Sequence, residues 1–297
     1  MSWVSTIRRN LMARIPDGVD LNELTVVARR VLLDALQALY EHSDAIVLVG
    51  AQAVHLRTTG VVLASSPYTS DADLSLNPKL IRDEPLLNEA MRGAGFELTI
   101  PNSPGLWTRT EMINGQSHPV EVDLLVPETL APNRGRRSAH LPPHDKNATR
   151  HVLGLEATLF DHSSLQVPSL EPENDSRELP IEVAGPTSLL IAKAFKLRDR
   201  INDRAAPPHR LADKDAGDVV RLMMATGDSL RSTFKRLSQE EQIRDVVAKG
   251  CKLLWEQFGS ARATGVQMAV RALAGDLEEE RIRLLAPAFV EANVPEL

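Results

Sequence analysis

The sequence predicts an α+β protein: a mixed sheet flanked by helices, followed by an all-α C-terminal domain. The first part of the chain alternates helical apolar spacing with short strand patterns, whereas the spacing after Pro186 is helical almost continuously as far as Pro295. Apolar residues make up 43% and charged residues 25% of the 297 residues, which is ordinary for a chain with a sizeable core. We therefore expect two domains, 1–185 and 186–297.

The first predicted elements form a helix–strand–helix unit. Between Asp20 and Tyr40 apolar residues recur at helical spacing, which predicts a long packing helix. The run AIVLVG is then typical of a buried strand, and AQAVHLRTTG resumes helical character. Gly50 thus falls at a strand-to-helix turn, where the first helical N–H groups lack internal partners and can bind an anion.

Two acidic strands are predicted downstream. In TSDADLSLN, alternation places Asp71, Asp73 and Ser75 on one face and apolar residues on the other, so that one side is buried and the other carries carboxylates. In PVEVDLLVP, Glu121 and Asp123 share a face in the same way. Because sequential strands often pair, we expect these acidic faces to lie near each other.

The other elements are predicted from the spacing of apolar residues and from the positions of glycine and proline. A helix is expected over 85–94, followed by strands at FELTI and LWTRTEMI; the stretch 127–150 is expected to be a long surface loop, and LGLEATLF, LQVPSL and LPIEVAGP to be short strands. The helices expected after Pro186 are 187–200, 212–226, 240–258, 261–273 and 278–291.

The acidic pattern is suited to a divalent metal. Mg²⁺ or Mn²⁺ prefers carboxylate oxygens, and two aspartates at i and i+2 of a strand project to the same side. Asp71, Asp73 and Asp123 can supply three metal ligands, with Glu121 as the alternative third acid. A D-x-D pair by itself is more often a solvated strand face, so the interpretation depends on Gly50 before it and on the E-x-D strand after it.

In this order the residues resemble the nucleotidyltransferase superfamily, whose fold is shared with the DNA polymerase β palm. Gly50 matches the glycine of the family's turn, Asp71 and Asp73 match its metal-binding pair, and Asp123 matches its third carboxylate. The resemblance implies a nucleoside triphosphate substrate and release of pyrophosphate. The family usually has Gly-Gly or Gly-Ser at the turn, whereas here Ala51 follows Gly50.

Phosphate contacts are also expected near this turn. Gly50 and Ala51 are candidates through their backbone, and Ser70 is a candidate through its hydroxyl. Turn formation explains Ser70 equally well.

A basic helix and an acidic helix open the second domain. In SLLIAKAFKLRDR, Lys193, Lys196 and Arg200 lie on one side of the predicted helix, and in LADKDAGDVV, Asp215 and Asp218 lie one turn apart. For isolated segments, the expected role is a solvated helix pair with ion pairs of about 0.3–0.5 kcal/mol each.

Together these helices resemble the second domain of the AbiEii family, the nucleotidyltransferase toxins of type IV toxin–antitoxin pairs. The resemblance implies that Lys193 holds the triphosphate, with Lys196 and Arg200 beside it, and that Asp215 orients the lysine or serves as base. It also implies a tRNA acceptor and an antitoxin protein as partner.

Two other functions remain open. The enzyme could modify a small molecule, as antibiotic-modifying nucleotidyltransferases do, and the net charge of −6 slightly favours this alternative over nucleic acid. A non-catalytic nucleotide-binding regulator of the same fold would fit the Gly50-Ala51 departure. Cys251 is the only cysteine and no apolar run reaches a membrane span, so we expect a cytoplasmic protein without disulfides or membrane contact.

Several further residues invite a functional interpretation without a strong pattern. His55 follows the Gly50 turn and is expected at the surface or near the nucleotide, and Cys251 is expected to be packed in a helix. A basic segment has the charge for contact with an RNA acceptor, although such runs are more often solvated; it comprises Arg134, Arg136, Arg137, Lys146 and Arg150. The spacing of His140, His144 and His151 fits no zinc pattern.

Overall fold

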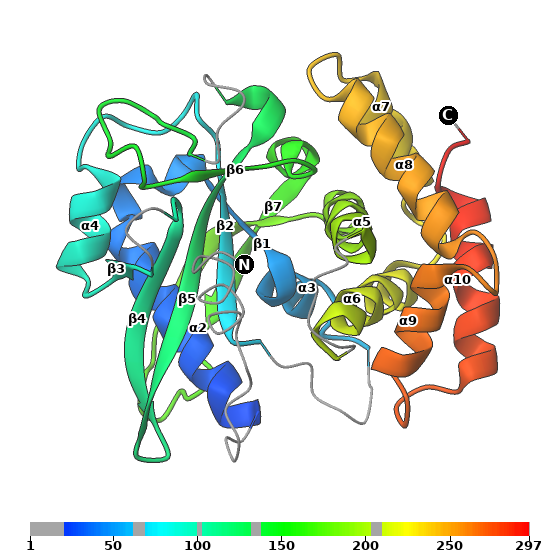
Figure 1. Cartoon of the computed structure of the whole chain (residues 1–297), viewed down its shortest axis with the longest axis horizontal. Helices are drawn as coiled ribbons and strands as arrows, with labels where there is room; N and C mark the ends of the chain where they lie inside the picture. Colours follow the sequence, from blue (N-terminus) through cyan, green and yellow to red (C-terminus); the bar gives the residue numbers. More distant parts are fainter. Residues whose placement is uncertain (1–20, 62–68, 100–102, 132–137, 203–209, 297) are drawn as a thin grey trace, which may run out of the picture.

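The computed structural model describes residues 21–61, 69–99, 103–131, 138–202 and 210–296. Within them the chain is α+β: a mixed open sheet flanked by helices, followed by a helical C-terminal region (Figure 1). No helix among the described residues is both long and apolar enough to cross a membrane. Of the predicted basic segment, Arg134, Arg136 and Arg137 lie outside the described residues.

The sheet has eight strands in the order β3-β4-β5-β2-β1-β8-β7, with β6 paired to the end of β5. The central pairs β2–β5 and β1–β8 are parallel, whereas β1–β2 and β4–β5 are antiparallel. The strands are β1 (Ile46–Val49), β2 (Asp71–Leu76), β3 (Glu97–Leu98), β4 (Leu106–Ile113), β5 (Gln116–Pro127), β6 (Arg150–Val152), β7 (His162–Pro168) and β8 (Glu178–Ala184).

The helices fall into two groups. In the first part of the chain they are α2 (Leu21–Ala38), α3 (Gly50–Arg57) and α4 (Leu87–Gly93), with the 3₁₀ turns η1 (Tyr40–Ala45), η2 (Glu128–Leu130) and η3 (Glu156–Leu159). In the second part they are α5 (Pro186–Asn202), α6 (Arg210–Thr226), α7 (Arg231–Gln239), α8 (Arg244–Phe258), α9 (Thr264–Ala272) and α10 (Glu279–Asn293).

Helix α3 connects the two parts of the structure. It packs against β1 and β2 on one side and against α5 and α6 on the other, so it lies between the sheet and the C-terminal helices (Figure 1). The N-terminal helix α2 packs instead against β2, β4 and β5. The aliphatic core is continuous from α2 through the sheet to α10, as expected for a chain poor in aromatic residues.

Some predicted elements differ from the structure. The strand expected at LGLEATLF is wrong, because residues 156–159 form the 3₁₀ turn η3, in which the Glu156 carboxylate accepts hydrogen bonds from the backbone N–H groups of Gly154 and Thr129. Helix α7 was not predicted, because its apolar side rests on little more than Phe234 and Leu237. The strand at FELTI is limited to two residues, 97–98.

Candidate functional site

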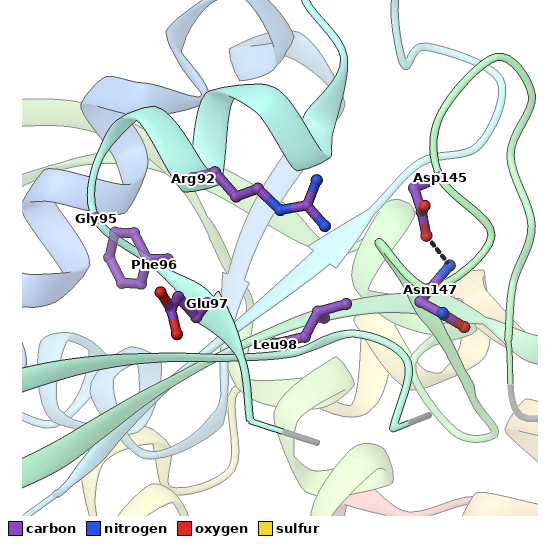
Figure 2. A pocket seen from close by; sticks show the side chains of 7 residues that line it. All are labelled: Arg92, Gly95, Phe96, Glu97, Leu98, Asp145 and Asn147. Atoms are coloured by element: carbon purple, nitrogen blue, oxygen red, sulfur yellow. Dashed lines mark hydrogen bonds between the residues drawn. The ribbon is translucent and has the colours of Figure 1, made fainter. Parts of the chain in front are cut away.

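The cavities of the structure differ in their chemistry. One of about 480 Å³ lies beside α4 and is lined by Arg92, Gly95, Phe96, Glu97, Leu98, Asp145 and Asn147 (Figure 2). Its Asp145 accepts a hydrogen bond from the Asn147 backbone N–H at 2.7 Å, as in an ordinary turn. The Glu97 and Asp145 carboxylates lie apart in Figure 2, and none of the predicted site residues is present, so this cavity has no convergent chemistry.

A second cavity, of about 440 Å³, brings together acidic side chains from the sheet and basic side chains from α5. Aliphatic side chains form the remaining wall, a combination expected of small-molecule sites. The cavity is lined by Val49, Gly50, Asp71, Asp73, Asp123, Leu125, Arg150, Val152, Leu153, Leu155, Leu189, Ala192, Lys193, Lys196, Asp199 and Arg200. Most of the predicted site residues thus line one cavity; Ser70 and Ala51 are not among the lining residues, and neither is Asp215.

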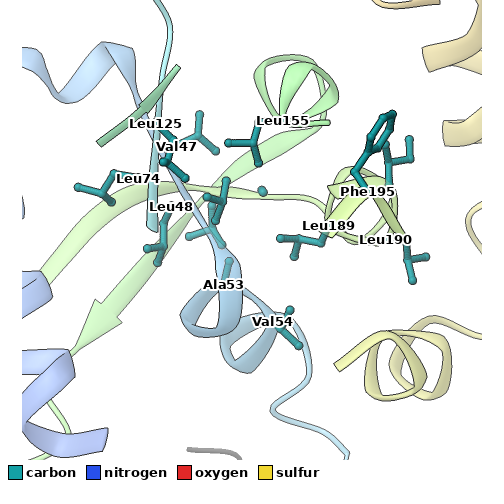
Figure 3. Close-up of a cluster of buried hydrophobic side chains, with 14 of the residues drawn as sticks. Val47, Leu48, Ala53, Val54, Leu74, Leu125, Leu155, Leu189, Leu190 and Phe195 are labelled. Atoms are coloured by element: carbon teal, nitrogen blue, oxygen red, sulfur yellow. The ribbon is translucent and has the colours of Figure 1, made fainter. Parts of the chain in front are cut away.

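An apolar cluster holds α5 against the sheet behind this cavity. Figure 3 shows Leu189, Leu190 and Phe195 of α5 on one side and the β1 and β2 side chains on the other, with Leu155 between them. These residues are almost completely buried. Because burial of each such side chain stabilises the fold by about 1.5–3 kcal/mol, the cavity walls are fixed relative to each other.

Adjacent strands place the acidic residues side by side. In the parallel β2–β5 register, Asp71 is opposite Glu121 and Asp73 is opposite Asp123. The predicted sharing of a face by these residues is therefore present. The carboxylate face is less open than the alternation suggested, since Asp73 and Asp123 are each only 9% exposed and Ser75 is fully buried.

The Gly50 turn contacts this acidic pair directly. Gly50 has a φ of +72°, and a β-carbon at this position would lie 2.0 Å from Asp73 Oδ2, so only glycine fits without a shift. Helix α3 begins here, and the side chain of its N-cap residue, Val49, makes no capping hydrogen bond. Its first N–H groups are therefore not satisfied by a capping side chain, and the positive end of the helix lies at the cavity wall.

Strand β2 is also held from behind. Gln52, on α3, donates hydrogen bonds to the backbone carbonyls of Asp71 (3.4 Å) and Ala28 (3.2 Å). The side-chain oxygen Oε1 of Gln52 accepts a 2.7 Å hydrogen bond from Arg29 Nε. Arg29 Nη1 also donates to the backbone carbonyl of Pro168. This buried pair ties α2, α3 and β2 together, and the sequence patterns did not single it out.

Asp71 and Asp123 have different hydrogen-bond partners. Asp71 Oδ1 accepts a 2.8 Å hydrogen bond from Thr69 Oγ1, and Asp123 Oδ2 accepts a 2.5 Å charged hydrogen bond from Arg150. Asp123 Oδ1 is buried and has no hydrogen-bond partner among the described residues. A buried carboxylate oxygen with no partner is costly, so this atom is a candidate ligand position.

Burial and mutual repulsion raise the proton affinity of this cluster. Burial, reinforced by the charge of Asp71, raises the pKa of Asp73, and burial together with the charges of Asp73 and Asp71 raises that of Asp123 well above its usual range. Burial and Asp71 likewise raise the pKa of Glu121 to about 7. For Asp71, burial is outweighed by the ammonium groups of Lys196 and Lys214, so its pKa is lowered.

The donor set fits a hard divalent cation, because it offers several carboxylate oxygens, one of them without a partner. The ligands are not ready-made, however. Across the part of the chain that the structure describes, no three His, Cys, Asp or Glu side chains converge as a metal-binding group. The chemistry of the oxygens thus suits a metal ion, whereas their present orientation is directed to Thr69 and Arg150.

The helical wall carries a closed charge network. Lys193 is 3% exposed, and its Nζ donates to Asp215 Oδ1 and Asp218 Oδ2, both at 2.6 Å. Asp215 also pairs with Arg200 at 2.5 Å and with Lys196 at 3.8 Å. Lys193 therefore reaches the cavity wall while it is fixed from behind by two buried carboxylates.

These contacts determine the proton equilibria of the network. Burial alone would lower the pKa of Lys193 and raise that of Asp215. The opposite charges outweigh burial in both cases, so the pKa of Lys193 is raised and that of Asp215 is held far below its usual range. Asp215 therefore remains ionised and is poorly suited to accept a proton.

Sequence patterns missed two cations in this region. Arg150 was assigned to a basic loop, but it begins β6 and pairs with Asp123. Lys214 is close enough to Asp71 and Asp218 for their charges to raise its pKa, although burial dominates and the net pKa is lowered. The K-D dipeptide in LADKDAGD was the available signal for Lys214, and no pattern pointed to Arg150.

The remaining candidate residues do not line the cavity. His55 lies on α3 facing α6, where burial lowers its pKa to about 4. His144 accepts a hydrogen bond from the Leu87 backbone N–H, and its ring lies 5.7 Å from that of His42 in an edge-to-face arrangement. Cys251 is buried, and burial raises its pKa to about 12. Ser70 is half-buried and lies directly before β2.

No protein-family model matches the chain, and the search of curated proteins found no match to it.

Proposed function

We propose that this protein is a metal-dependent nucleotidyltransferase with a nucleotidyltransferase-type fold. It transfers a nucleoside monophosphate from a nucleoside triphosphate to an acceptor hydroxyl and releases pyrophosphate. One observation carries the proposal: Asp71, Asp73 and Asp123 of adjacent strands line the same cavity as Lys193, Lys196 and Arg200 of α5. Carboxylates for a divalent ion and cations for phosphate oxygens are what nucleotidyl transfer requires of a protein.

The metal would be Mg²⁺ or Mn²⁺, and Asp71, Asp73 and Asp123 would hold it. When bound, it neutralises the triphosphate and strengthens the leaving group. The raised pKa values of Asp73 and Asp123 support this assignment, since a cluster of buried like charges is stabilised by a divalent cation.

The basic wall binds the triphosphate. Lys193 acts as a fixed point charge, because Asp215 and Asp218 hold its ammonium group. Lys196 and Arg200 are more exposed and suit the outer phosphates. The N–H groups at the start of α3, from Gly50 and Ala51, add the positive end of a helix, and Ser70 remains a candidate for a phosphate contact.

In the reaction, an oxygen–phosphorus bond forms between the acceptor hydroxyl and the α-phosphorus, and the bond from this phosphorus to the pyrophosphate oxygen breaks. The hydroxyl proton requires a base. Asp215 is ill-suited because its pKa is held low by its cations, which favours a positioning role over general-base catalysis. Glu121 has a pKa of about 7 but does not line the cavity, so it is not assigned as the base.

The acceptor proposed is tRNA, in the setting of a toxin with an antitoxin partner, and the alternatives are a small hydroxyl compound or no acceptor at all. The test is to incubate the protein with each labelled nucleoside triphosphate, Mg²⁺ and total tRNA, and in parallel with a panel of small polyhydroxyl compounds. Label in RNA supports the toxin-type enzyme. Label in a small compound alone supports the antibiotic-type enzyme.

The control variants are Asp73→Ala and Asp44→Asn, the latter at a surface aspartate that pairs with the exposed Arg82. Asp73→Ala is expected to abolish transfer, and Asp44→Asn is expected to transfer as the unchanged protein does. Undiminished transfer by Asp73→Ala would overturn the mechanism. Triphosphate binding without transfer to any acceptor would support the non-catalytic regulator instead.

A further inference from the structure

Arg150 is fixed beside the third carboxylate by the backbone. Strand β4 stops pairing with β5 at the Leu106–Asp123 register, and β6 pairs with β5 from Leu125 onwards, beginning with Arg150 itself. Gly105, with a φ of +75°, makes this exchange of strands possible, since a β-carbon there would lie 2.7 Å from the Arg150 backbone nitrogen. The Arg150 side chain therefore starts next to Asp123 and lines the cavity.

The Arg150–Asp123 ion pair is incomplete on both sides. Arg150 Nη2 donates to Asp123 Oδ2 at 2.5 Å, but Arg150 Nε and Asp123 Oδ1 are both buried and have no hydrogen-bond partner in the part of the chain that the structure describes. The Arg150 side chain is 37% exposed, whereas that of Asp123 is 12% exposed. A guanidinium that binds a carboxylate permanently is usually bidentate, so this contact uses only part of what Arg150 can offer.

Arg177 shows what a saturated pair looks like in this protein. Its Nε and Nη2 both donate to Asp175, and its Nη1 donates to Asp34 and Gln37. Every nitrogen of that guanidinium is engaged, as expected for a structural ion pair. Arg150 is instead a cation with donors to spare at the wall of the cavity.

We propose that Arg150 is a positioning residue that exchanges partners: it holds Asp123 while the site has no metal, and it moves to phosphate oxygens when a metal–triphosphate complex binds. The inference rests on the proposed function. A divalent ion at Asp123 Oδ1 and Arg150 at Oδ2 compete for the charge of one carboxylate, and the guanidinium fork matches phosphate oxygens as well as carboxylates. The site therefore takes up the divalent ion as a triphosphate complex in preference to the ion alone.

The experiment titrates Mn²⁺ into the full-length protein and follows the loss of the free-ion signal by electron paramagnetic resonance, once with Mn²⁺ alone and once with inorganic tripolyphosphate. Arg150→Met is expected to bind Mn²⁺ alone about tenfold more tightly than the unchanged protein, because a partly buried competing charge is removed. The same variant is expected to bind the Mn²⁺–tripolyphosphate complex more weakly, because the guanidinium contact is lost.

The matched control is Arg200→Met, which removes the same charge from the same cavity but from Asp215 instead of Asp123. Its affinity for Mn²⁺ alone is expected to change by no more than about threefold, since only a longer-range field is altered. Arg150→Lys keeps Asp123 partnered and serves if Arg150→Met does not fold. It is expected to bind Mn²⁺ alone with an affinity between those of the unchanged protein and of a neutral variant.

The outcomes separate this inference from the function on which it rests. If the unchanged protein binds Mn²⁺ but neither Arg150 variant binds it more tightly, the exchange is overturned and the nucleotidyltransferase proposal stands. An equal gain in Arg200→Met would also overturn it, because a general field effect would then be sufficient. If no variant binds Mn²⁺ with or without tripolyphosphate, both proposals fail.

Discussion

The two walls of the cavity are charged in different ways. On the helical wall, Lys193 donates to Asp215 and Asp218 at 2.6 Å. Asp215 Oδ2 has no hydrogen-bond partner among the described residues but forms an ion pair with Arg200 at 2.5 Å, so the network is closed by opposite charges. On the sheet wall, Asp73 and Asp123 are buried side by side, and Asp123 Oδ1 has no partner. The difference is in line with the proposed function, in which the helical network positions Lys193 and the acidic wall takes up a divalent cation.

The largest expected effect breaks the closed network. Replacing Lys193 by Met leaves Asp215 and Asp218 buried without their common partner, and a buried ion pair broken in this way typically costs about 3–5 kcal/mol. Urea unfolding is the measurement. The control is Lys252→Met, which removes an exposed helix ion pair with Glu256 and is expected to change stability by about 0.5 kcal/mol or less. Equal effects would contradict a closed network.

The next effect tests how the turn shapes the acidic wall. Gly50→Ala places a β-carbon against Asp73 Oδ2 and also strains the backbone, so we expect a loss of about 2–3 kcal/mol. Gly115→Ala is the matched control, since Gly115 has a φ of +75° but open space around it, and backbone strain alone costs about 1 kcal/mol. The measurement is urea unfolding of both variants. Equal losses in their free energies of unfolding would contradict the packing argument.

A smaller effect concerns His55 of α3 and makes the free energy of unfolding depend on pH. Burial lowers the pKa of His55 from its ordinary 6.5 to about 4. Between these two pH values the unfolded chain is protonated at His55 and the folded protein is not. Stability from this group is complete above about pH 6.5 and is lost as the pH falls towards 4, with a loss on the order of 2 kcal/mol at pH 5.

Urea unfolding at pH 7.5 and at pH 5 measures this loss as the difference between the unchanged protein and His55→Gln. The same substitution at the exposed His140 is the control. A pH dependence that is identical in the unchanged protein and in His55→Gln would exclude His55 as its source.

The smallest effect concerns the acidic wall in the absence of metal. Asp73→Asn keeps the shape of the side chain and removes one of several buried like charges, so the free energy of unfolding is expected to rise by about 0.5–1 kcal/mol. Thermal or urea unfolding in the presence of a chelator is the measurement. A large loss of stability would show that Asp73 is already fully compensated inside the protein.

The sequence predicted the sheet wall better than the helical wall. Strict alternation in TSDADLSLN and PVEVDLLVP was enough to place Asp71, Asp73, Glu121 and Asp123 on adjacent strand faces, because side chains repeat every two residues. Alternation carries no information about what covers a face, so the burial of Asp73 and Ser75 was not predicted.

The sequence patterns also could not predict which side chains pair when they are far apart in the chain. The pairing of Arg150 with Asp123 depends on β6 replacing β4 beside β5, a register that local patterns do not encode. The double contact of Lys193 with Asp215 and Asp218 depends in the same way on how α5 packs against α6. Helix α7 and the turn η3 were missed because each is short and has few apolar residues to define a period.

The central claim is that the acidic wall binds a divalent ion together with a triphosphate. The most direct measurement is the binding of Mn²⁺ and a non-hydrolysable nucleoside triphosphate analogue, followed by electron paramagnetic resonance in the unchanged protein, Asp73→Asn and Asp44→Asn. We expect the unchanged protein and Asp44→Asn to bind the complex alike, and Asp73→Asn to bind it at least about tenfold more weakly. Equal binding by all three proteins would contradict the claim.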